Sequence, residues 1–538
     1  SGTGVPPVDH AQDGRATFKL HQHCVLHLTT IYICPPPPIT INGLMLLLCP
    51  AQKQDLMFLF QANISQSFQS PIVRVLLGAI AIALLYVFYK EVRKIPAKLF
   101  TLMITAFVDM VGLLMIIPLM PFYVKTLGGS GITLLGFHVG IGTISGVIVA
   151  AFTVAQLLSA PMWGRFSDRV GRRPTLLIAL GAAGISYLVF GFATSLWVLF
   201  LSRIVQGAGG GTVGVIQAYV ADSTDPKDRA RALGWLSATT NLGVALGPVL
   251  GSLAIAIGKR DIIPGHASLQ MGHAAPGIMA AALCGLNMIF AWRYLSESRD
   301  AEVHAATDAP PRKSRQAAWS IISNSSEPSS RLIWIYAIAI GAFQGSFSVL
   351  ALFLNARFQV TELTIGYFFM YTGAISVFAR VLLLGRMVDW LGEAKLSRLG
   401  LVLLSLGVVG MPLSTNLGML AIAVALIPLG TAFTFPCVTA LLSRVINPRE
   451  RGLYMGMQQT YGGVARIIAP LFYGWAFDSL GVSSPYYFSS AIIAATILLG
   501  FGLDKYARPE LPISAAVASA TEISEPEEVP ALAKEQKA

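Results

Sequence analysis

Long apolar stretches separated by short polar segments dominate the chain after residue 98. The hydrocarbon core of a bilayer is about 30 Å thick, so a helix needs roughly 20 consecutive apolar residues to span it. We place twelve such stretches, each apolar around its whole circumference. They cover residues 99–124, 136–161, 174–194, 196–220, 231–257, 275–295, 332–355, 362–386, 396–414, 417–442, 453–477 and 485–503. The pattern therefore predicts an all-α membrane protein.

Composition and charge support the same class. Hydrophobic residues make up 54% of the 538 and charged residues only 12%, which is too apolar for a soluble fold of this length. The net charge of +11 could indicate a nucleic-acid partner, but the inner loops hold 19 of the Lys and Arg residues if the first helix enters from the cytoplasm. The outer loops hold only Lys125, Lys259, Arg260 and Arg357. This positive-inside distribution predicts a multi-pass protein of the cell (inner) membrane, with the lipid bilayer and not nucleic acid as partner.

The segments outside the twelve stretches have their own character. Residues 1–70 mix His, Gln and Pro, and we expect them to be disordered or to lie outside the mature protein. Residues 71–98 hold a short apolar run followed by four basic residues, which predicts an extra helix that either spans the membrane or lies at its interface. Residues 296–330, rich in Ser, Ala, Pro and charge, are the expected cytoplasmic linker, and 504–538 the cytoplasmic tail.

The chain is internally duplicated. A shift of 222 residues lays 225–229 (DPKDR) on 447–451 (NPRER) and Pro248 on Pro470. Two homologous six-helix halves follow, 99–295 and 331–503. A shift of 221 lays the loop at 164–173 on 385–394, where Glu393 and Ala394 replace two arginines. We therefore interpret the second loop as a degraded copy.

The loop between the second and third stretches carries the most specific motif, GRFSDRVGRR. Its glycines permit tight turning, and its aspartate can cap a helix or pair with an arginine. The spacing resembles the signature loop of the major facilitator superfamily, which implies a twelve-helix fold with a substrate site between the halves. By that resemblance, Asp168 would dock near Arg449 in the outward-open state, and Arg172 would pair with Asp222. The predicted gating residues are Gly164, Asp168, Arg169, Gly171, Arg172, Arg173 and Asp222.

Two charged residues lie deep in predicted spanning helices. Asp109 is about ten residues from the inner edge of the first, and Arg203, in LSRIVQG, about seven from the outer edge of the fourth. A charge at mid-membrane costs about 2.5–3.5 kcal/mol, so both should face a cavity or a partner. At 1.5 Å per residue their depths are close enough for interaction. Burial favours a protonated Asp109 and a nearby arginine favours the ionised form, as a reversible proton carrier requires. The LSRIVQG run resembles the family motif whose arginine is associated with proton coupling.

The fifth stretch carries spaced small residues and one proline, Gly234, Gly243, Gly247, Pro248 and Gly251. Small residues allow close helix packing and proline kinks a helix. The pattern resembles the family's antiporter motif, with Ser252 where that motif has a second glycine. Residues 108–252 look most like drug:proton antiporters of the tetracycline-efflux type. This resemblance implies a monomer that exports small organic molecules in exchange for protons by alternating access.

Four polar residues are candidates for lining the substrate cavity: Gln206, Gln344, Tyr371 and Arg466. The counterpart of Arg466 in the first half is Val244, so this arginine is not inherited from the duplication. Arg466 either contacts the substrate or forms a structural pair with another group of the protein. If it faces the cavity, acidic or zwitterionic substrates are favoured over lipophilic cations.

Other functions remain as alternatives. A metabolite or organic-anion uptake transporter of the same fold is opposed by the fifth-helix glycines. A non-transporting sensor or scaffold is opposed by Asp109 and the loop charges. We find no catalytic Ser-His-Asp grouping, nucleotide loop, metal site or cofactor motif, and the five cysteines are scattered, so we expect neither an enzyme nor disulfides.

Overall fold

A computed structural model describes residues 96–134, 136–210, 213–224, 229–259, 272–297, 314–447 and 450–506. Nine helices in these ranges are long and apolar enough to cross a membrane. A helix pair bent by 50° supplies a tenth crossing if it is one span. The last two predicted stretches coincide with a 30-residue helix and an apolar helix of 16 residues. The elements are consistent with twelve spans, and the predicted extra helix at 71–98 lies almost wholly outside the described residues.

The first half runs from α3 to α10. Short breaks divide the first and fourth predicted spans, each into two helices. Its elements are α3 (Ala97–Ile116), η1 (Ile117–Leu119), α4 (Met120–Gly128), β1 (Ile132–Leu134), β2 (Phe137–Val139), α5 (Ile141–Val170), α6 (Arg172–Gly191), α7 (Leu196–Gly209), α8 (Val213–Asp222), α9 (Arg229–Gly258), η3 (Gly272–Ala274) and α10 (Ala275–Tyr294).

The second half repeats this order after a short helix in the linker. A π-helical turn interrupts its second span. Its elements are α11 (Ser314–Ser323), α12 (Pro328–Ser348), α13 (Leu350–Phe358), α14 (Ile365–Phe378), η5 (Ala379–Leu383), α15 (Leu384–Leu391), α16 (Glu393–Leu413), α17 (Leu417–Val445), α18 (Arg451–Leu480), α19 (Ser484–Leu499) and η6 (Leu503–Tyr506).

Two features differ from the sequence-based expectation. The second span begins at Ile141 and not at 136, because β1 and β2 pair as an antiparallel hairpin with Thr133 opposite His138. Gly136, at φ 84°, lies in its turn. The linker contains α11, which is held to the second half because the Tyr461 hydroxyl donates to the carbonyl of Ala318 at 2.8 Å.

Each half packs mainly around its own apolar core. The largest buried side chains of the first include Tyr187, Phe190 and Tyr219. In the second, the rings of Phe353 and Tyr486 lie 4.4 Å apart. Helices in lipid associate through close packing and not through exclusion of water, so such well-packed contacts hold each half together.

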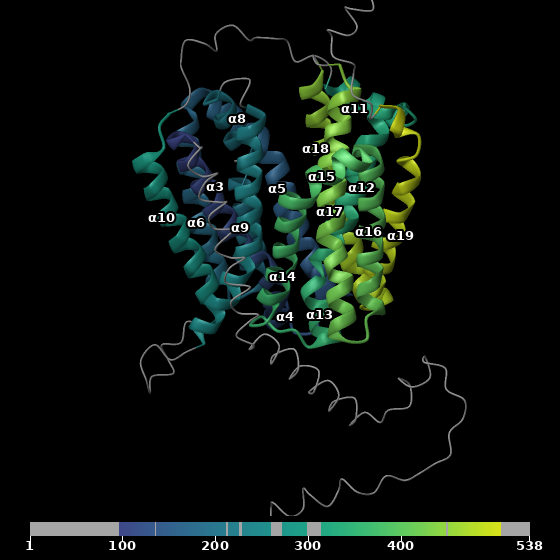
Figure 1. Cartoon of the computed structure of the whole chain (residues 1–538). Coiled ribbons are helices and arrows are strands. Elements are labelled where there is room, and N and C mark those ends of the chain that lie inside the picture. Colours follow the sequence, from purple (N-terminus) through teal and green to yellow (C-terminus); the bar gives the residue numbers. More distant parts are fainter. Residues whose placement is uncertain are drawn as a thin grey trace, which may run out of the picture. The chain divides into compact units, whose positions relative to one another are not determined.

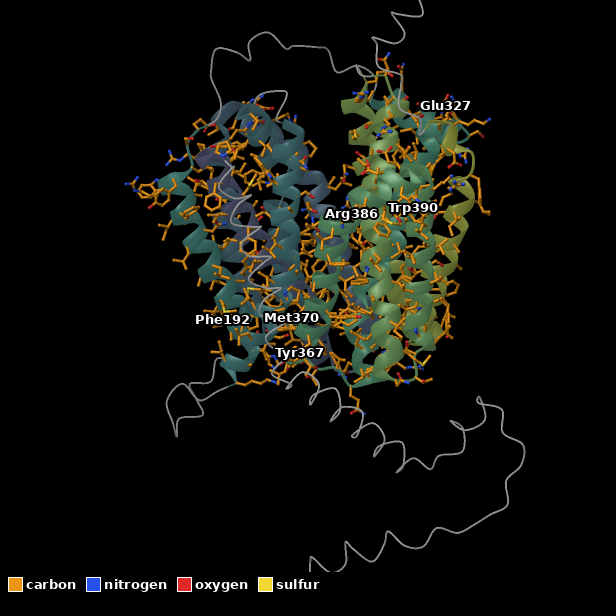
Figure 2. All side chains as sticks on the ribbon, in the orientation of Figure 1. Phe192, Glu327, Tyr367, Met370, Arg386 and Trp390 are labelled. Carbon is orange, nitrogen blue, oxygen red and sulfur yellow. The ribbon has the colours of Figure 1, made fainter. Side chains whose placement is uncertain are left out.

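Large apolar side chains remain exposed on the outside of the helices, as lipid contact requires. Trp197, near the outer ends, is 74% exposed and Trp390, at the inner end of α15, is 77% exposed. Such tryptophans are typical of the two membrane interfaces. Figure 2 shows Tyr367 toward the outer end and Glu327 at the inner end.

Small residues bring the two halves together. Figure 1 shows α5 and α9 of the first half beside α18 and α14 of the second. A Cβ added to Gly146 would lie 2.1 Å from the carbonyl oxygen of Pro470, and one on Gly373 would lie 2.4 Å from Cβ of Ala245. Larger side chains cannot occupy these positions, so the glycines set the distance between the halves.

Candidate transport site and cytoplasmic ion pairs

The first cluster of paired charges is centred on Arg172, the first residue of α6. Gly171 adopts φ 111°, which reverses the chain directly after α5. The Arg172 Nη1 donates to Asp168 Oδ1 at 2.7 Å and to Ser167 Oγ at 2.9 Å, and its Nε donates to Asp222 Oδ2 at 2.9 Å. The expected pairing of Arg172 with Asp222 is present. One guanidinium thus ties the inner ends of α5, α6 and α8 together.

Glu297, which follows α10, completes this cluster and was not predicted. Its Oε1 accepts from the backbone N–H of Arg172 at 2.9 Å and its Oε2 from that of Arg173 at 3.1 Å. It therefore caps α6. A Cβ on Gly171 would lie 2.6 Å from Glu297 Oε2, so this loop glycine is required for the cap. Arg173 also donates to the carbonyl of Trp292. The position of Glu297 just after the sixth predicted stretch could have indicated a contact with a helix end, but we assigned Glu297 to the linker.

The remaining loop residues have fewer contacts. An added Cβ on Gly164 would meet nothing within 4 Å, and Arg169 is exposed. The Asp168 side chain is 60% exposed. Its expected docking partner Arg449 lies outside the described residues. The structure therefore gives the geometry of the loop, while its gating role stays a prediction.

The second copy of the loop is not degraded in its ion pair, contrary to our interpretation. Gly392 adopts φ 72°, and Glu393, the first residue of α16, accepts from Arg444 Nη2 at 2.7 Å. Shifts of 221 and 222 map Arg172 onto Glu393 and Asp222 onto Arg444. The pair is kept with its charges exchanged. The exchange places an acid at a helix N-terminus, where the helix dipole favours negative charge.

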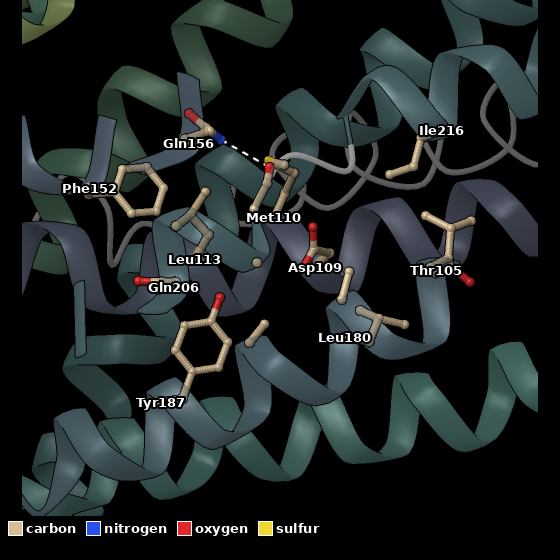
Figure 3. A pocket seen from close by; sticks show the side chains of 15 residues that line it. Thr105, Asp109, Met110, Leu113, Phe152, Gln156, Leu180, Tyr187, Gln206 and Ile216 are labelled. Carbon is tan, nitrogen blue, oxygen red and sulfur yellow. Dashed lines mark hydrogen bonds between the residues drawn. The ribbon is translucent and has the colours of Figure 1, made fainter. Parts of the chain in front are cut away.

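A partly open pocket of the first half contains Asp109, which is half-buried. The volume of the pocket is about 40 Å³, enough for only a few water molecules. Figure 3 shows Asp109 of α3, Tyr187 of α6 and Gln206 of α7 converging there. Gln206 is 3% exposed, and its amide lies beside the Tyr187 side chain. The lining also includes Thr105, Met110, Leu113, Phe152, Gln156, Leu176, Ala179, Leu180, Ala183, Gly209, Gly210 and Ile216.

Arg203 does not form an ion pair with Asp109 in the described structure. It is 2% exposed, its guanidinium carbon lies 5.0 Å from the centre of the Phe190 ring, and its Nε and Nη2 have no hydrogen-bond partner. Tyr187 lies within electrostatic range of both Asp109 and Arg203. The similar depths of Asp109 and Arg203 in the membrane therefore do not bring the two side chains into contact, because α7 directs Arg203 toward the Phe190 ring on α6.

The fifth-helix glycines connect α9 to the helix that carries Asp109. A Cβ on Gly251 would lie 2.3 Å from the carbonyl oxygen of Met115 in α3. A Cβ on Gly243 or on Gly247 would also lie within 3 Å of an atom of α3. Gly234 faces open space. Three of the four glycines therefore serve one close contact between α3 and α9.

Pro248 and Ser252 contact the opposite half. A Cβ on Gly366 of α14 would lie 2.8 Å from Ser252 Oγ and 3.2 Å from the carbonyl oxygen of Pro248. Ser252, 6% exposed, accepts a hydrogen bond from the Gly366 N–H at 3.0 Å. The one departure from the antiporter motif is therefore a polar contact between the halves.

The other predicted cavity residues do not line the Asp109 pocket. Gln344 is exposed, and Tyr371 is 41% exposed with its hydroxyl donating to the carbonyl of Ala421 at 3.2 Å. Among the four candidates, the structure places only Gln206 beside Asp109.

Arg466 occupies the face of α18 that turns toward α5 and α12. Gly462 and Gly463, one turn earlier, pack against Tyr336 of α12 and Leu157 of α5 respectively. Residues at i and i+3 or i+4 share a helix face, so Arg466 lies above these two contacts. It is half-buried, and its Nε donates to the carbonyl of Gly462 at 3.2 Å.

Two halves of membrane-length helices, joined through small residues and with paired charges at equivalent helix ends, are the arrangement of a membrane transporter. The chain belongs to the Major Facilitator Superfamily, whose family model matches residues 102–417 and 381–532.

Several named proteins are similar to this chain. The chain is 27% identical to Multidrug resistance protein 2 of Bacillus subtilis (strain 168) over 422 residues, which cover 77% of this chain and 96% of that protein. It is 29% identical to the class C Tetracycline resistance protein of Escherichia coli over 367 residues, covering 68% and 86%. The human organic anion transporter MFSD10 (TETRAN) shares the fold, with a TM-score of 0.57, 22% identity, and coverage of 75% of this chain and 99% of that one.

Proposed function

We propose that this protein is a proton-coupled antiporter that exports small organic molecules of the drug or tetracycline type. The observation that carries the proposal is the pocket in which the half-buried Asp109 lies with Tyr187 and Gln206. Multidrug and tetracycline resistance relatives support the substrate class. We further propose that it acts as a monomer in the cell (inner) membrane.

The proton step uses Asp109 as the group that gains and loses the proton. An ionised carboxylate at this depth is costly, so proton binding stabilises the pocket when it is closed to water. Arg203 supplies a fixed positive charge in the same half, and Tyr187 lies within electrostatic range of both groups. Proton loss toward the cytoplasm restores the ionised form, and a few water molecules in the pocket provide the path.

The helix contacts support coupling of this proton step to the halves. The glycines of α9 pack on α3, and the opposite face of α9 contacts α14 through Ser252 and Gly366. A shift of α3 on proton binding is therefore transmitted to the cross-half contact. We assign the Arg172 and Glu393 ion pairs the role of holding each inner end rigid while the halves move.

A direct test uses everted membrane vesicles energised to an acidic interior. Addition of a transported drug should release protons from the interior and accumulate drug there. A panel of tetracyclines, lipophilic cations and organic anions identifies the substrate class. If no drug in the panel changes the proton gradient, the proposed export is wrong. Drug movement in the opposite direction would support the uptake alternative, and a sensor would show neither movement.

Arg466 predicts a preference in substrate charge. If it faces the space between the halves, a carboxylate or enolate gains charge-assisted hydrogen bonds, whereas a permanent cation is repelled in a low-dielectric site. Arg466→Ala should reduce export of anionic or zwitterionic drugs about tenfold, the loss expected for one hydrogen bond to a charged group. Export of quaternary ammonium compounds should stay equal or rise. Efficient wild-type export of such cations, together with an Arg466→Ala variant that exports every compound normally, would rule out this role.

A further inference from the structure

A side chain of the second half caps the helix that begins the second span of the first half. Asp478, near the outer end of α18, accepts from the N–H of Gly142 at 2.9 Å and from the N–H and hydroxyl of Thr143 at 2.7 Å each. These N–H groups belong to the first turn of α5, where no partner exists within the helix. The residue before α5 is Gly140, which has no side chain for a cap, and its missing Cβ leaves room for the Asp478 carboxylate.

The second span of the second half, α14, is capped by a side chain of the first half. Thr364, before α14, makes no side-chain cap, and the N–H of Gly366 in the first turn donates to Ser252 Oγ of α9. In each case the fifth span of one half caps the second span of the other. The two caps therefore join equivalent helix pairs, although the capping residues themselves are one turn apart, since a shift of 222 maps Ser252 onto Gly474.

Further polar contacts join the halves at the same outer level. Lys259 pairs with Glu362 at 2.7 Å, and Lys125 donates to Asn355 Oδ1 at 2.8 Å. The inner ion pairs of Arg172 and of Glu393, by contrast, each stay within one half. The described contacts are those of a carrier whose outer side is closed.

We propose that Asp478 and Ser252 are paired outer caps that hold the two halves together on the outer side and must separate before the carrier opens outward. This inference rests on alternating access in the proposed function. When the halves part, the N–H groups of α5 and α14 lose these acceptors and bind water. The Asp478 cap contributes more, because it is charged and accepts three hydrogen bonds, whereas Ser252 accepts one.

The test measures the distance between spin labels at Thr194→Cys and Thr415→Cys by pulsed electron paramagnetic resonance. Both threonines are exposed and lie in outer turns, one in each half, away from the caps. Cys24, Cys34 and Cys49 are replaced by Ser. Buried Cys284 and Cys437 are retained. The protein is studied in nanodiscs without substrate, so the result does not depend on transport.

Asp478→Ala should raise the ratio of long to short distances about tenfold, which is about 1.4 kcal/mol. Ser252→Ala should raise it about threefold, and the double variant roughly by the product, since the caps lie in separate helix pairs. If Asp478→Ala does not fold, Asp478→Asn and Thr143→Val, which weaken the same cap, should each shift the ratio in the same direction.

Two substitutions within the second half serve as matched controls. Asp504→Asn breaks the 2.6 Å ion pair with Arg398, and Ser405→Ala removes the two hydrogen bonds that the Ser405 hydroxyl makes with Ser490. Neither should change the distance distribution. An unchanged distribution in the double cap variant would overturn the inference, as would a shift of equal size in the controls. A protein that fails to export drugs can still pass this test, so the inference and the proposed function fail separately.

Discussion

Replacing Asp109 by Asn is expected to abolish proton-driven export while folded protein still reaches the membrane. Asparagine keeps the size of the side chain in the pocket but cannot release a proton. A charge at mid-membrane costs about 2.5–3.5 kcal/mol. Without a titrating group, the roughly hundredfold difference in stability between the ionised and the protonated states of the pocket is lost. Drug-dependent proton release in everted vesicles measures the effect, with protein quantified in the same membranes.

The matched control for this variant is Asp389→Asn, because Asp389 is an exposed acid in the second inner loop. It should retain most of the wild-type proton release. Downhill drug movement without a proton gradient is a second readout, and Asp109→Asn should preserve it if the substrate path is intact. Normal proton-driven export by Asp109→Asn would exclude this residue as the coupling site.

The spanning helices could be predicted because the bilayer imposes their length and composition. Every predicted stretch coincides with described helices, and the loop spacing around Asp168 gave the family directly. The misplaced start of the second span has a local cause. Residues 136–140 are as apolar as a helix end, but the hairpin pairing of β1 with β2 satisfies their backbone groups instead.

The site was harder to predict, because depth along a helix says nothing about direction around it. Asp109 and Arg203 were placed at similar depths, yet Arg203 turns toward Phe190. Glu297 lies 125 residues along the chain from Arg172, whose N–H it binds, and the packing of α10 on α6 brings the two together. Ser252 was noted only as a departure from a motif. Its contact with α14 depends on how the halves meet, which the sequence of one half cannot show.

The exchanged ion pair of the second inner loop gives the other prediction with a large effect. Glu393→Arg places a second guanidinium against Arg444, at a side chain that is 9% exposed. Breaking a fully buried pair costs about 3–5 kcal/mol. We expect about 2 kcal/mol here because Arg444 is 45% exposed. This should lower the melting temperature of the purified protein by roughly 4–8 °C.

The double variant Glu393→Arg with Arg444→Glu restores opposite charges in the orientation of the Arg172 and Asp222 pair. It should recover most of the lost melting temperature, although an arginine at the N-terminus of α16 opposes the helix dipole and leaves a deficit of about 0.5 kcal/mol. Arg444→Glu alone should be destabilising, since it sets two acids against each other. A double variant no more stable than its worse single variant would show that the two side chains contribute independently and that the second loop holds no functional pair.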